Sequence, residues 1–397
     1  MTALFTDNNR WLLPEGIEEL LPQQAEHFER LRRQLLDLFH SWGYEMVMPP
    51  LVEYIESLLI GRGDDLDLQT YKLTDQLNGR LMGIRADITP QVARIDAHHL
   101  QREAPTRLCY VGNVLHTRPD GFASGRTPMQ VGAELYGHKG VESDVEVLQL
   151  MVAALDLTGI KHLFVDLGHV GIFRGLARAA GLDHEQEAQL FDAMQRKAKP
   201  DMGLLLRDLA IEPCWRDLFM ALVDLNGDTA VLAEARHVLK NTGADVQRAL
   251  DELVKVAEEI RQRLPQLPLH FDLAELRGYH YKTGIVFAAF VPGHGQELAR
   301  GGRYDDIGKV YGRPRAATGF SADLKMLIKQ SVATANTIHA ILAPYSNDAA
   351  LQQRILQLRA AGERVITELP HSQGHMGEVG CDRRLLCHDG EWVIQPL

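Results

Sequence analysis

Apolar residues recur with helical spacing between Pro22 and Trp42. This spacing gathers the apolar side chains on one face and predicts an amphipathic helix that packs on a core. Gly43 ends the helix, and residues 44–50, which finish with two prolines, predict a strand. The side chains expected on the apolar face of the helix are Leu31, Leu35, Leu36, Phe39 and Trp42.

Shorter strand and helix patterns follow. Residues 71–75 and 81–85 flank the pair Asn78-Gly79, and Asn-Gly between alternating segments is the strongest short signal for a hairpin. Residues 89–100 and 144–157 have helical spacing. Further strands are predicted at residues 107–114, 129–136, 162–166, 269–273, 284–290 and 298–303.

Residues 173–264 differ from the segments around them in composition and in hydrophobic pattern. They are rich in Ala, Leu, Glu and Arg with almost no strand signal, which predicts a helical insertion. A helix over residues 321–333 is expected to close the main domain. The tail then predicts a strand at 339–344, a helix at 348–361 and a strand at 364–369.

The order of these elements predicts an α+β fold with an antiparallel sheet, because the strands are separated mostly by hairpins and long loops. We divide the chain into a core of residues 1–172 and 265–334, the insertion at 173–264, and a small α/β domain at 335–397. A Rossmann domain is disfavoured. No G-x-G-x-x-G follows a strand, and no G-x-x-x-x-G-K-[ST] occurs.

Composition narrows the class of protein. The 397 residues are 45% hydrophobic and 24% charged, as in soluble globular proteins, and no apolar run is long enough to span a bilayer. The first residues lack the pattern of a signal peptide, so we expect a cytoplasmic protein. A net charge of −11 argues against nucleic acid as a partner, since phosphate binding needs a basic face.

The cysteines and histidines predict neither disulfides nor a metal site. Cys109, Cys214, Cys381 and Cys387 show no paired spacing. Near the end of the chain, His371, His375 and His388 lie close in sequence to two of these cysteines. Their spacing matches no zinc pattern, so we expect no metal there.

Several strings taken together resemble class II aminoacyl-tRNA synthetases, most closely the histidyl-tRNA synthetase family. Each string is short and weak alone, but their shared order over residues 10–330 is specific. The resemblance implies a class II fold, with the first string building a dimer interface. The strings are Gly43–Tyr54 (motif 1), 73–79 with 84–94, 110–118 with 130–134 (motif 2), 277–287, 301–305 and 319–327 (motif 3).

The ATP-binding positions depart from this family. The synthetases hold the phosphates of ATP with one motif 2 and one motif 3 arginine, whose guanidinium groups are planar and always charged. In this chain His116 occupies the position of the motif 2 arginine. If the alignment is shifted by one residue, Leu115 occupies it instead. Arg118 occupies the position of the glutamate that contacts adenine, and Met326 replaces the motif 3 arginine. The resemblance therefore implies that ATP activation is lost, with no cofactor.

The positions that bind the amino acid in the synthetases are better preserved than those that bind ATP. By resemblance, Asp87 and Gln130 bind the α-ammonium of histidine, Glu134 binds the imidazole ring, and Arg277 lies near the carboxylate. Tyr281 is also kept, whereas the neighbouring Lys282 replaces a second tyrosine of the family. Asp87, Gln130 and Glu134 could instead be remnants of a decayed pocket. We favour a working histidine site over that alternative.

Residues 122–137 and 277–284 are very similar to a relative of the synthetases, the regulatory subunits of short-form ATP phosphoribosyltransferase. About sixty residues follow the core, fewer than in an anticodon-binding domain. The resemblance implies a non-catalytic subunit of histidine biosynthesis. Its partners would be the catalytic subunit, in a hetero-octamer, a second copy of this chain through motif 1, and the effector histidine, without tRNA or membrane.

Three rival interpretations remain at this point. The chain could be an active histidyl-tRNA synthetase, another class II amino-acid ligase that uses ATP, or a scaffold that binds no ligand. The position of the effector is also open. Histidine could lie in the synthetase-like pocket or at the interface with the catalytic subunit.

Overall fold

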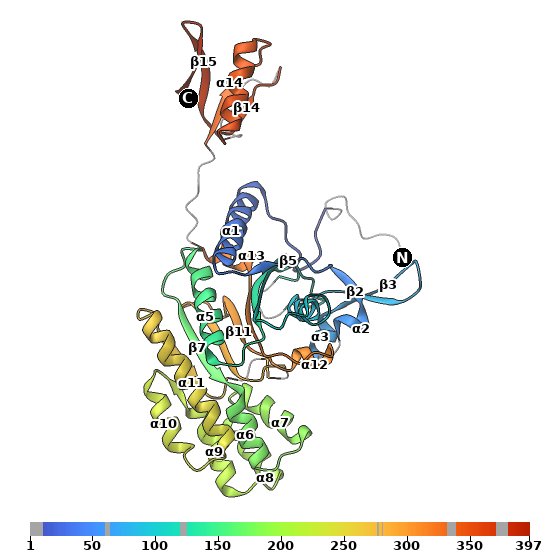
Figure 1. Cartoon of the computed structure of the whole chain (residues 1–397), viewed down its shortest axis with the longest axis vertical. Coiled ribbons are helices and arrows are strands. Elements are labelled where there is room, and N and C mark those ends of the chain that lie inside the picture. The colour runs from blue at the N-terminus through green and yellow to red at the C-terminus, as the bar shows by residue number, and fades with distance from the viewer. Residues whose placement is uncertain are drawn as a thin grey trace. The chain divides into compact units, whose positions relative to one another are not determined.

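The structure is a computed structural model that describes residues 11–59, 64–119, 125–275, 278–279, 281–331, 339–370 and 380–397. The chain divides into two compact units, Met1–Val332 and Ala333–Leu397. Figure 1 labels the helices and strands in chain order. None of the described helices is long and apolar enough to cross a membrane.

The first unit combines helices with one large and one small sheet. Its helices are α1 (Pro22–Ser41), α2 (Ile55–Leu58), α3 (Asp64–Gln69), α4 (Thr89–Ile95), α5 (Val141–Asp156), α6 (Val170–Ala179), α7 (His184–Gln195), α8 (Lys199–Asp208), α9 (Pro213–Asp224), α10 (Ala230–Val238), α11 (Ala244–Arg263), α12 (Ile307–Val310) and α13 (Leu324–Gln330). Its strands are β1 (Glu45–Met46), β2 (Val52–Tyr54), β3 (Tyr71–Thr74), β4 (Leu81–Ile84), β5 (Thr106–Asn113), β6 (Met129–Tyr136), β7 (Phe164–His169), β8 (Asn226–Gly227), β9 (Leu269–Asp272), β10 (Ile285–Phe290), β11 (Ala299–Arg303) and β12 (Ala317–Asp323).

In the described residues the large sheet has nine strands in the order β1-β5-β6-β12-β11-β10-β7-β9-β8. From β5 to β7 every neighbouring pair is antiparallel, as the sequence predicts. The pairs β1 with β5 and β7 with β9 are parallel, so the sheet is mixed at its sides. The fold is therefore α+β, with an antiparallel centre.

Helix α1 confirms the first expected element. Its buried residues include Leu31, Leu35 and Phe39, while Trp42 packs against the same core from just beyond the helix end. Gly43 follows with a φ of +80°, a left-handed conformation that glycine adopts without strain. The strand expected over residues 44–50 is shorter than predicted, since β1 spans only Glu45–Met46. Pro49 and Pro50 lie beyond it and have no N–H to donate to a sheet.

The Asn78-Gly79 hairpin also forms. Strands β3 and β4 pair antiparallel, and β2 joins them on the other side of β4 as a three-stranded sheet. The helix expected over residues 89–100 is α4, which passes into one π-helical turn at Asp96–Leu100. The junction between β4 and α4 carries Asp87, one of the expected site residues.

The helical segment between β7 and β9 runs from α6 to α11 and forms a group of helices at one end of the first unit (Figure 1). It is interrupted by β8, a two-residue strand that pairs with β9 and was not predicted. Helix α11 contacts α6, α5 and β7. The helical segment is thus packed on the sheet.

The helix expected at the end of the main domain is correct only in part. The helix predicted over residues 321–333 begins only at Leu324, because Ser321–Asp323 belong to strand β12 in the middle of the sheet. The side chain of Asp323 accepts a hydrogen bond from the backbone N–H of Lys325 at 3.0 Å and so caps α13. Strand β12 is buried on both faces and so shows no alternation, and small residues such as Gly319 interrupt the apolar run that marks a buried strand.

The second unit contains α14 (Ala349–Ala360) and the strands β13 (Ala340–Ala343), β14 (Val365–Thr367), β15 (Cys381–His388) and β16 (Glu391–Pro396). The strand order is β14-β13-β15-β16. The prediction missed β15 and β16, which pair antiparallel around Asp389-Gly390. Both turn residues have positive φ, the geometry for which Asp-Gly is favoured, so the signal was present in the sequence.

Candidate ligand-binding site

A cavity of about 900 Å³ opens in the first unit. Of the residues expected to bind histidine, the described ones all line it: Asp87, Gln130, Glu134 and Tyr281. Arg277 lies outside the described residues. Two of the altered ATP positions, His116 and Met326, line the same cavity, whereas Arg118 is exposed and Leu115 is absent from the lining.

The register of the sheet explains why two of these residues act together. Gln130 and Glu134 are four residues apart on β6, and side chains at even spacing point to the same face of a strand. Glu134 lies opposite Gly319 of β12 and opposite Leu108 of β5. A Cβ atom on Gly319 would lie 1.6 Å from Glu134 Oε2, so only glycine leaves room for the carboxylate there.

Asp87 and Gln130 form one hydrogen-bonded unit. Gln130 Nε2 donates to Asp87 Oδ1 at 2.9 Å, and Gln130 Oε1 accepts from the backbone N–H of Ile88 at 2.8 Å. Asp87 Oδ1 also accepts from the backbone N–H of Thr89 at 3.0 Å. These bonds fix the orientation of the amide and of the carboxylate, which can present negative charge to an ammonium group.

Glu134 is almost fully buried, with 1% of its surface exposed. Its Oε1 accepts hydrogen bonds from Tyr110 and from Thr89 Oγ1, each at 3.0 Å, and its Oε2 accepts one from Tyr304. Burial raises the pKa of the Glu134 carboxyl to about 7, although Tyr304, Lys282 and Tyr110 act in the opposite direction. A buried carboxylate with this pKa can accept a proton or a hydrogen bond from a ligand near neutral pH.

The sequence flagged Lys282 only as a departure, but it lines the cavity and is buried. Its ammonium donates to the carbonyl of Gly302 at 3.2 Å and lies over the rings of Tyr281 and Tyr304, at 5.2 and 4.9 Å from their centroids. Carbonyl oxygens and aromatic faces both favour a cation. Lys282 is therefore part of the site.

Three further residues of the site were not predicted: Thr89, Tyr110 and Tyr304. All three belong to strings that carry the resemblance, but nothing in those strings says that their hydroxyl groups reach Glu134. Tyr110 lies opposite Gly132 in the β5–β6 pair, and a Cβ on Gly132 would lie 2.4 Å from the Tyr110 hydroxyl. The missing side chain lets the phenol cross to Glu134, two residues further along β6.

The comparisons with known proteins agree with this geometry. Residues 16–327 match the family model described as histidyl-tRNA synthetase, and residues 338–395 match that of the ATP phosphoribosyltransferase subunit HisZ C-terminal domain. The ATP phosphoribosyltransferase regulatory subunit of Thioalkalivibrio sulfidiphilus is 60% identical over 395 residues, which is 99% of this chain and 100% of that protein. This chain belongs to the ATP phosphoribosyltransferase regulatory subunit family.

Other relatives support the same placement in the regulatory subunit family. The regulatory subunit of Pseudomonas syringae is 56% identical over 393 residues, 98% of each chain. A solved structure from Bacillus halodurans, titled as a regulatory subunit/histidyl-tRNA synthetase, has a TM-score of 0.83 at 27% identity and covers 93% of this chain and 96% of that one. Histidyl-tRNA synthetase from Nostoc has a TM-score of 0.80 at 20% identity over 98% and 97% of the two chains, which shows the shared class II fold.

Within this family member, the altered ATP positions have specific surroundings. His116 Nε2 contacts the carbonyl of Ala86 at 2.9 Å, and because a carbonyl only accepts, Nε2 must carry the proton. The buried Nδ1 has no hydrogen-bond partner among the described residues. Met326 packs against the hydrophobic core from α13. Neither side chain supplies the two-pronged donor that a phosphate clamp requires.

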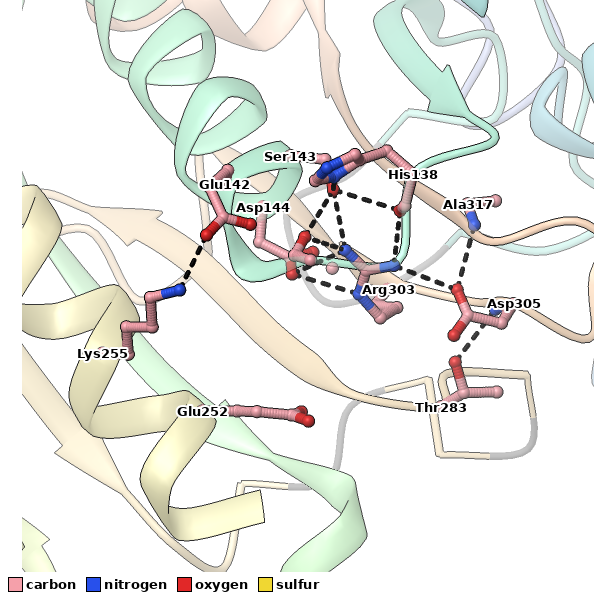
Figure 2. Close-up of polar contacts among 12 residues, drawn as sticks. His138, Glu142, Ser143, Asp144, Glu252, Lys255, Thr283, Arg303, Asp305 and Ala317 are labelled. Carbon is pink, nitrogen blue, oxygen red and sulfur yellow. Dashed lines mark hydrogen bonds and ion pairs between the residues drawn. The ribbon is translucent and has the colours of Figure 1, made fainter. Parts of the chain in front are cut away.

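A buried ion-pair network surrounds Arg303, the neighbour in sequence of Tyr304, which lines the cavity. Figure 2 shows this network. Arg303, at the end of β11, donates to Asp144 Oδ2 from Nε at 3.0 Å and from Nη2 at 2.8 Å, and to Ser143 Oγ at 2.8 Å. Its Nη1 reaches Asp305 at 3.2 Å. The network ties β11 to the start of α5 and fixes the residues on either side of Tyr304.

Proposed function

We propose that this chain is a non-catalytic regulatory subunit of short-form ATP phosphoribosyltransferase, the enzyme of the first step of histidine biosynthesis. It binds the catalytic subunit and transmits inhibition by histidine. The observation that carries the proposal is the buried carboxylate of Glu134, held by three donors in a cavity that also contains Met326 and His116. The cavity can recognise a basic amino acid but has lost two cationic side chains that would hold ATP.

Histidine fits the polar groups of this cavity. Its ammonium group would bind the fixed carboxylate of Asp87 beside Gln130. Its ring would bind Glu134, whose partners orient both carboxylate oxygens. By resemblance, Arg277 would pair with the carboxylate of the ligand. Binding to one state of the complex more tightly than to the other would shift the complex towards that state, which is the less active one.

The charges around the rest of the cavity support the loss of synthetase activity. Lys329 is paired with Glu18 at 2.7 Å, and Arg300 with Glu297 at 3.2 Å. Lys325 donates to Thr127 Oγ1 at 3.2 Å and is a point charge rather than a planar fork. An electrostatic clamp on a developing charge is worth several kcal/mol, so the loss of two clamps would leave ATP activation without adequate stabilisation.

The assembly is also part of the proposal. We propose a hetero-octamer with the catalytic subunit, in which two copies of this chain meet through the motif 1 segment Gly43–Tyr54. Met48 and Leu51 of that segment are exposed apolar residues, which a dimer interface would cover. Sedimentation velocity of the isolated chain distinguishes a dimer from a monomer.

Transfer RNA is not a proposed partner, given the net charge of −11, and a gel-shift titration tests this.

Calorimetric titration with histidine tests the site. We expect Glu134→Gln, which preserves volume but removes the charge, to weaken histidine binding at least tenfold, because hydrogen bonds to charged groups contribute about 1.5–3 kcal/mol. The control is Arg118→Gln, since Arg118 is exposed and does not line the cavity. Unchanged affinity in Glu134→Gln would move the effector to another site, such as the interface with the catalytic subunit.

A further inference from the structure

Lys282 and Glu134 place opposite charges at the same end of the cavity. Lys282 is 6% exposed and Glu134 is 1% exposed, so solvent screens the two charges only weakly. Their attraction lowers the pKa of the Glu134 carboxyl against the larger effect of burial. The two groups share Tyr304, whose hydroxyl donates to Glu134 while its ring lies under the Lys282 ammonium.

The backbone holds Lys282 in this position from both sides. The carbonyl of Lys282 accepts a hydrogen bond from Arg174 Nη1 at 2.7 Å. The next residue, Thr283, donates its N–H to the carbonyl of Arg303 at 2.8 Å, and its hydroxyl accepts from the N–H of Asp305 at 2.9 Å. Figure 2 shows Thr283 and Asp305 joined to the buried Arg303 network. These bonds hold the backbone at Lys282, and the carbonyl of Gly302 holds its ammonium.

The other titratable groups around Glu134 do not alter this balance near neutral pH. Burial raises the pKa of the Tyr110 and Tyr304 phenols well above the usual value, so both remain neutral donors. Asp87 adds negative charge, but it is bound to Gln130 and faces the expected ammonium of the ligand. The titratable groups that interact with Glu134 are Asp87, Tyr44, Tyr110, Tyr136, Lys282 and Tyr304, and Thr89 adds a neutral hydroxyl donor.

We propose that Lys282 is a specificity-determining residue that makes the cavity select the neutral form of the imidazole ring and disfavour the imidazolium form. The neutral ring can donate its single N–H to Glu134. Its other nitrogen then carries no charge next to the Lys282 ammonium. An imidazolium ion would place a second cation next to Lys282 in a poorly screened site. This inference rests on the proposed histidine site and adds which protonation state that site accepts.

The test compares histidine with triazolylalanine, an analogue whose ring stays neutral in mild acid. Calorimetry on the full chain gives both affinities at about pH 8 and about pH 5.5. Since free imidazole has a pKa near 6.5, roughly a tenth of histidine rings are neutral at the lower pH. We expect the affinity of histidine relative to triazolylalanine to fall about tenfold. Protonation of Glu134 cancels in this ratio as long as both ligands bind as neutral rings, and the Lys282 variants, which all retain Glu134, separate its effect from that of Lys282.

Two variants assign the effect to Lys282. Lys282→Met removes the charge at similar length, and its affinity ratio is expected to change less than about twofold between the two pH values. Lys282→Arg keeps the charge and should restore the fall, with circular dichroism confirming that each variant is folded. If Lys282→Met does not fold, Lys282→Gln, which also removes the charge, replaces it in the comparison.

The outcomes separate this inference from the proposed function. A ratio that stays flat in the unmodified chain, with both ligands bound, overturns the selection of the neutral ring and leaves the histidine site standing. A ratio that falls equally in Lys282→Met removes Lys282 as its cause. Failure of both ligands to bind at either pH overturns the histidine site itself, and this inference with it.

Discussion

Replacing Arg303 by methionine is expected to destabilise the first unit by about 3–5 kcal/mol, because it leaves the carboxylate of Asp144 buried without its partner. Asp144 is 1% exposed and receives two hydrogen bonds from Arg303. The same guanidinium also donates to the carbonyls of His138 and Gly140, which would lose their donor. Denaturant unfolding followed by circular dichroism measures the change.

Arg178→Met is the matched control. Arg178 pairs with Asp245 at 2.8 Å, but both side chains are largely exposed to solvent, where ion pairs contribute about 0–1 kcal/mol. Combining Arg303→Met with Asp144→Leu removes both buried charges and should recover part of the lost stability. If Arg303→Met were no less stable than Arg178→Met, the network in Figure 2 would not stabilise the first unit.

Histidine is expected to inhibit a complex of this chain with the catalytic phosphoribosyltransferase by fivefold or more, the usual range of coupling between two sites. The complex that carries Glu134→Gln should lose this inhibition, because the carboxylate that binds the ring is gone. Phosphoribosyltransferase activity is measured with and without histidine, and the ratio is compared within each complex. Size-exclusion chromatography shows whether each complex forms.

A complex with Arg118→Gln provides the reference for this comparison, since that residue lies outside the cavity lining. Inhibition that persists undiminished in the Glu134→Gln complex would place the effector at the interface between the subunits instead. A complex that histidine does not inhibit at all would contradict the regulatory role assigned to this cavity.

The sequence predicts most of the elements that carry long, regular patterns. Helix α1, the Asn78-Gly79 hairpin and the helical segment from α6 to α11 each follow from local spacing or turn chemistry. Strand β12 was misread, because its buried run of small residues around Gly319 shows no alternation. The hairpin of β15 and β16 was missed although Asp389-Gly390 marks its turn.

The residues of the site also fall into two groups, those that resemblance identifies and those that only the structure reveals. Resemblance points to Asp87, Gln130, Glu134 and Tyr281, and the structure gathers these four around one cavity. The hydrogen bond from Tyr110 to Glu134 depends on the register between two strands and on the missing side chain of Gly132. No local pattern contains that information. Arg118, by contrast, matched a motif position but lies outside the cavity lining.

The central claim is that the cavity binds histidine without activating ATP. Histidine-dependent exchange of pyrophosphate into ATP by the pure chain tests it most directly, at a histidine concentration that calorimetry shows to be saturating. The account predicts that histidine binds and that exchange stays at background, because His116 and Met326 cannot clamp the phosphates. Exchange clearly above background, lost in Glu134→Gln, would contradict it and make the chain an active synthetase.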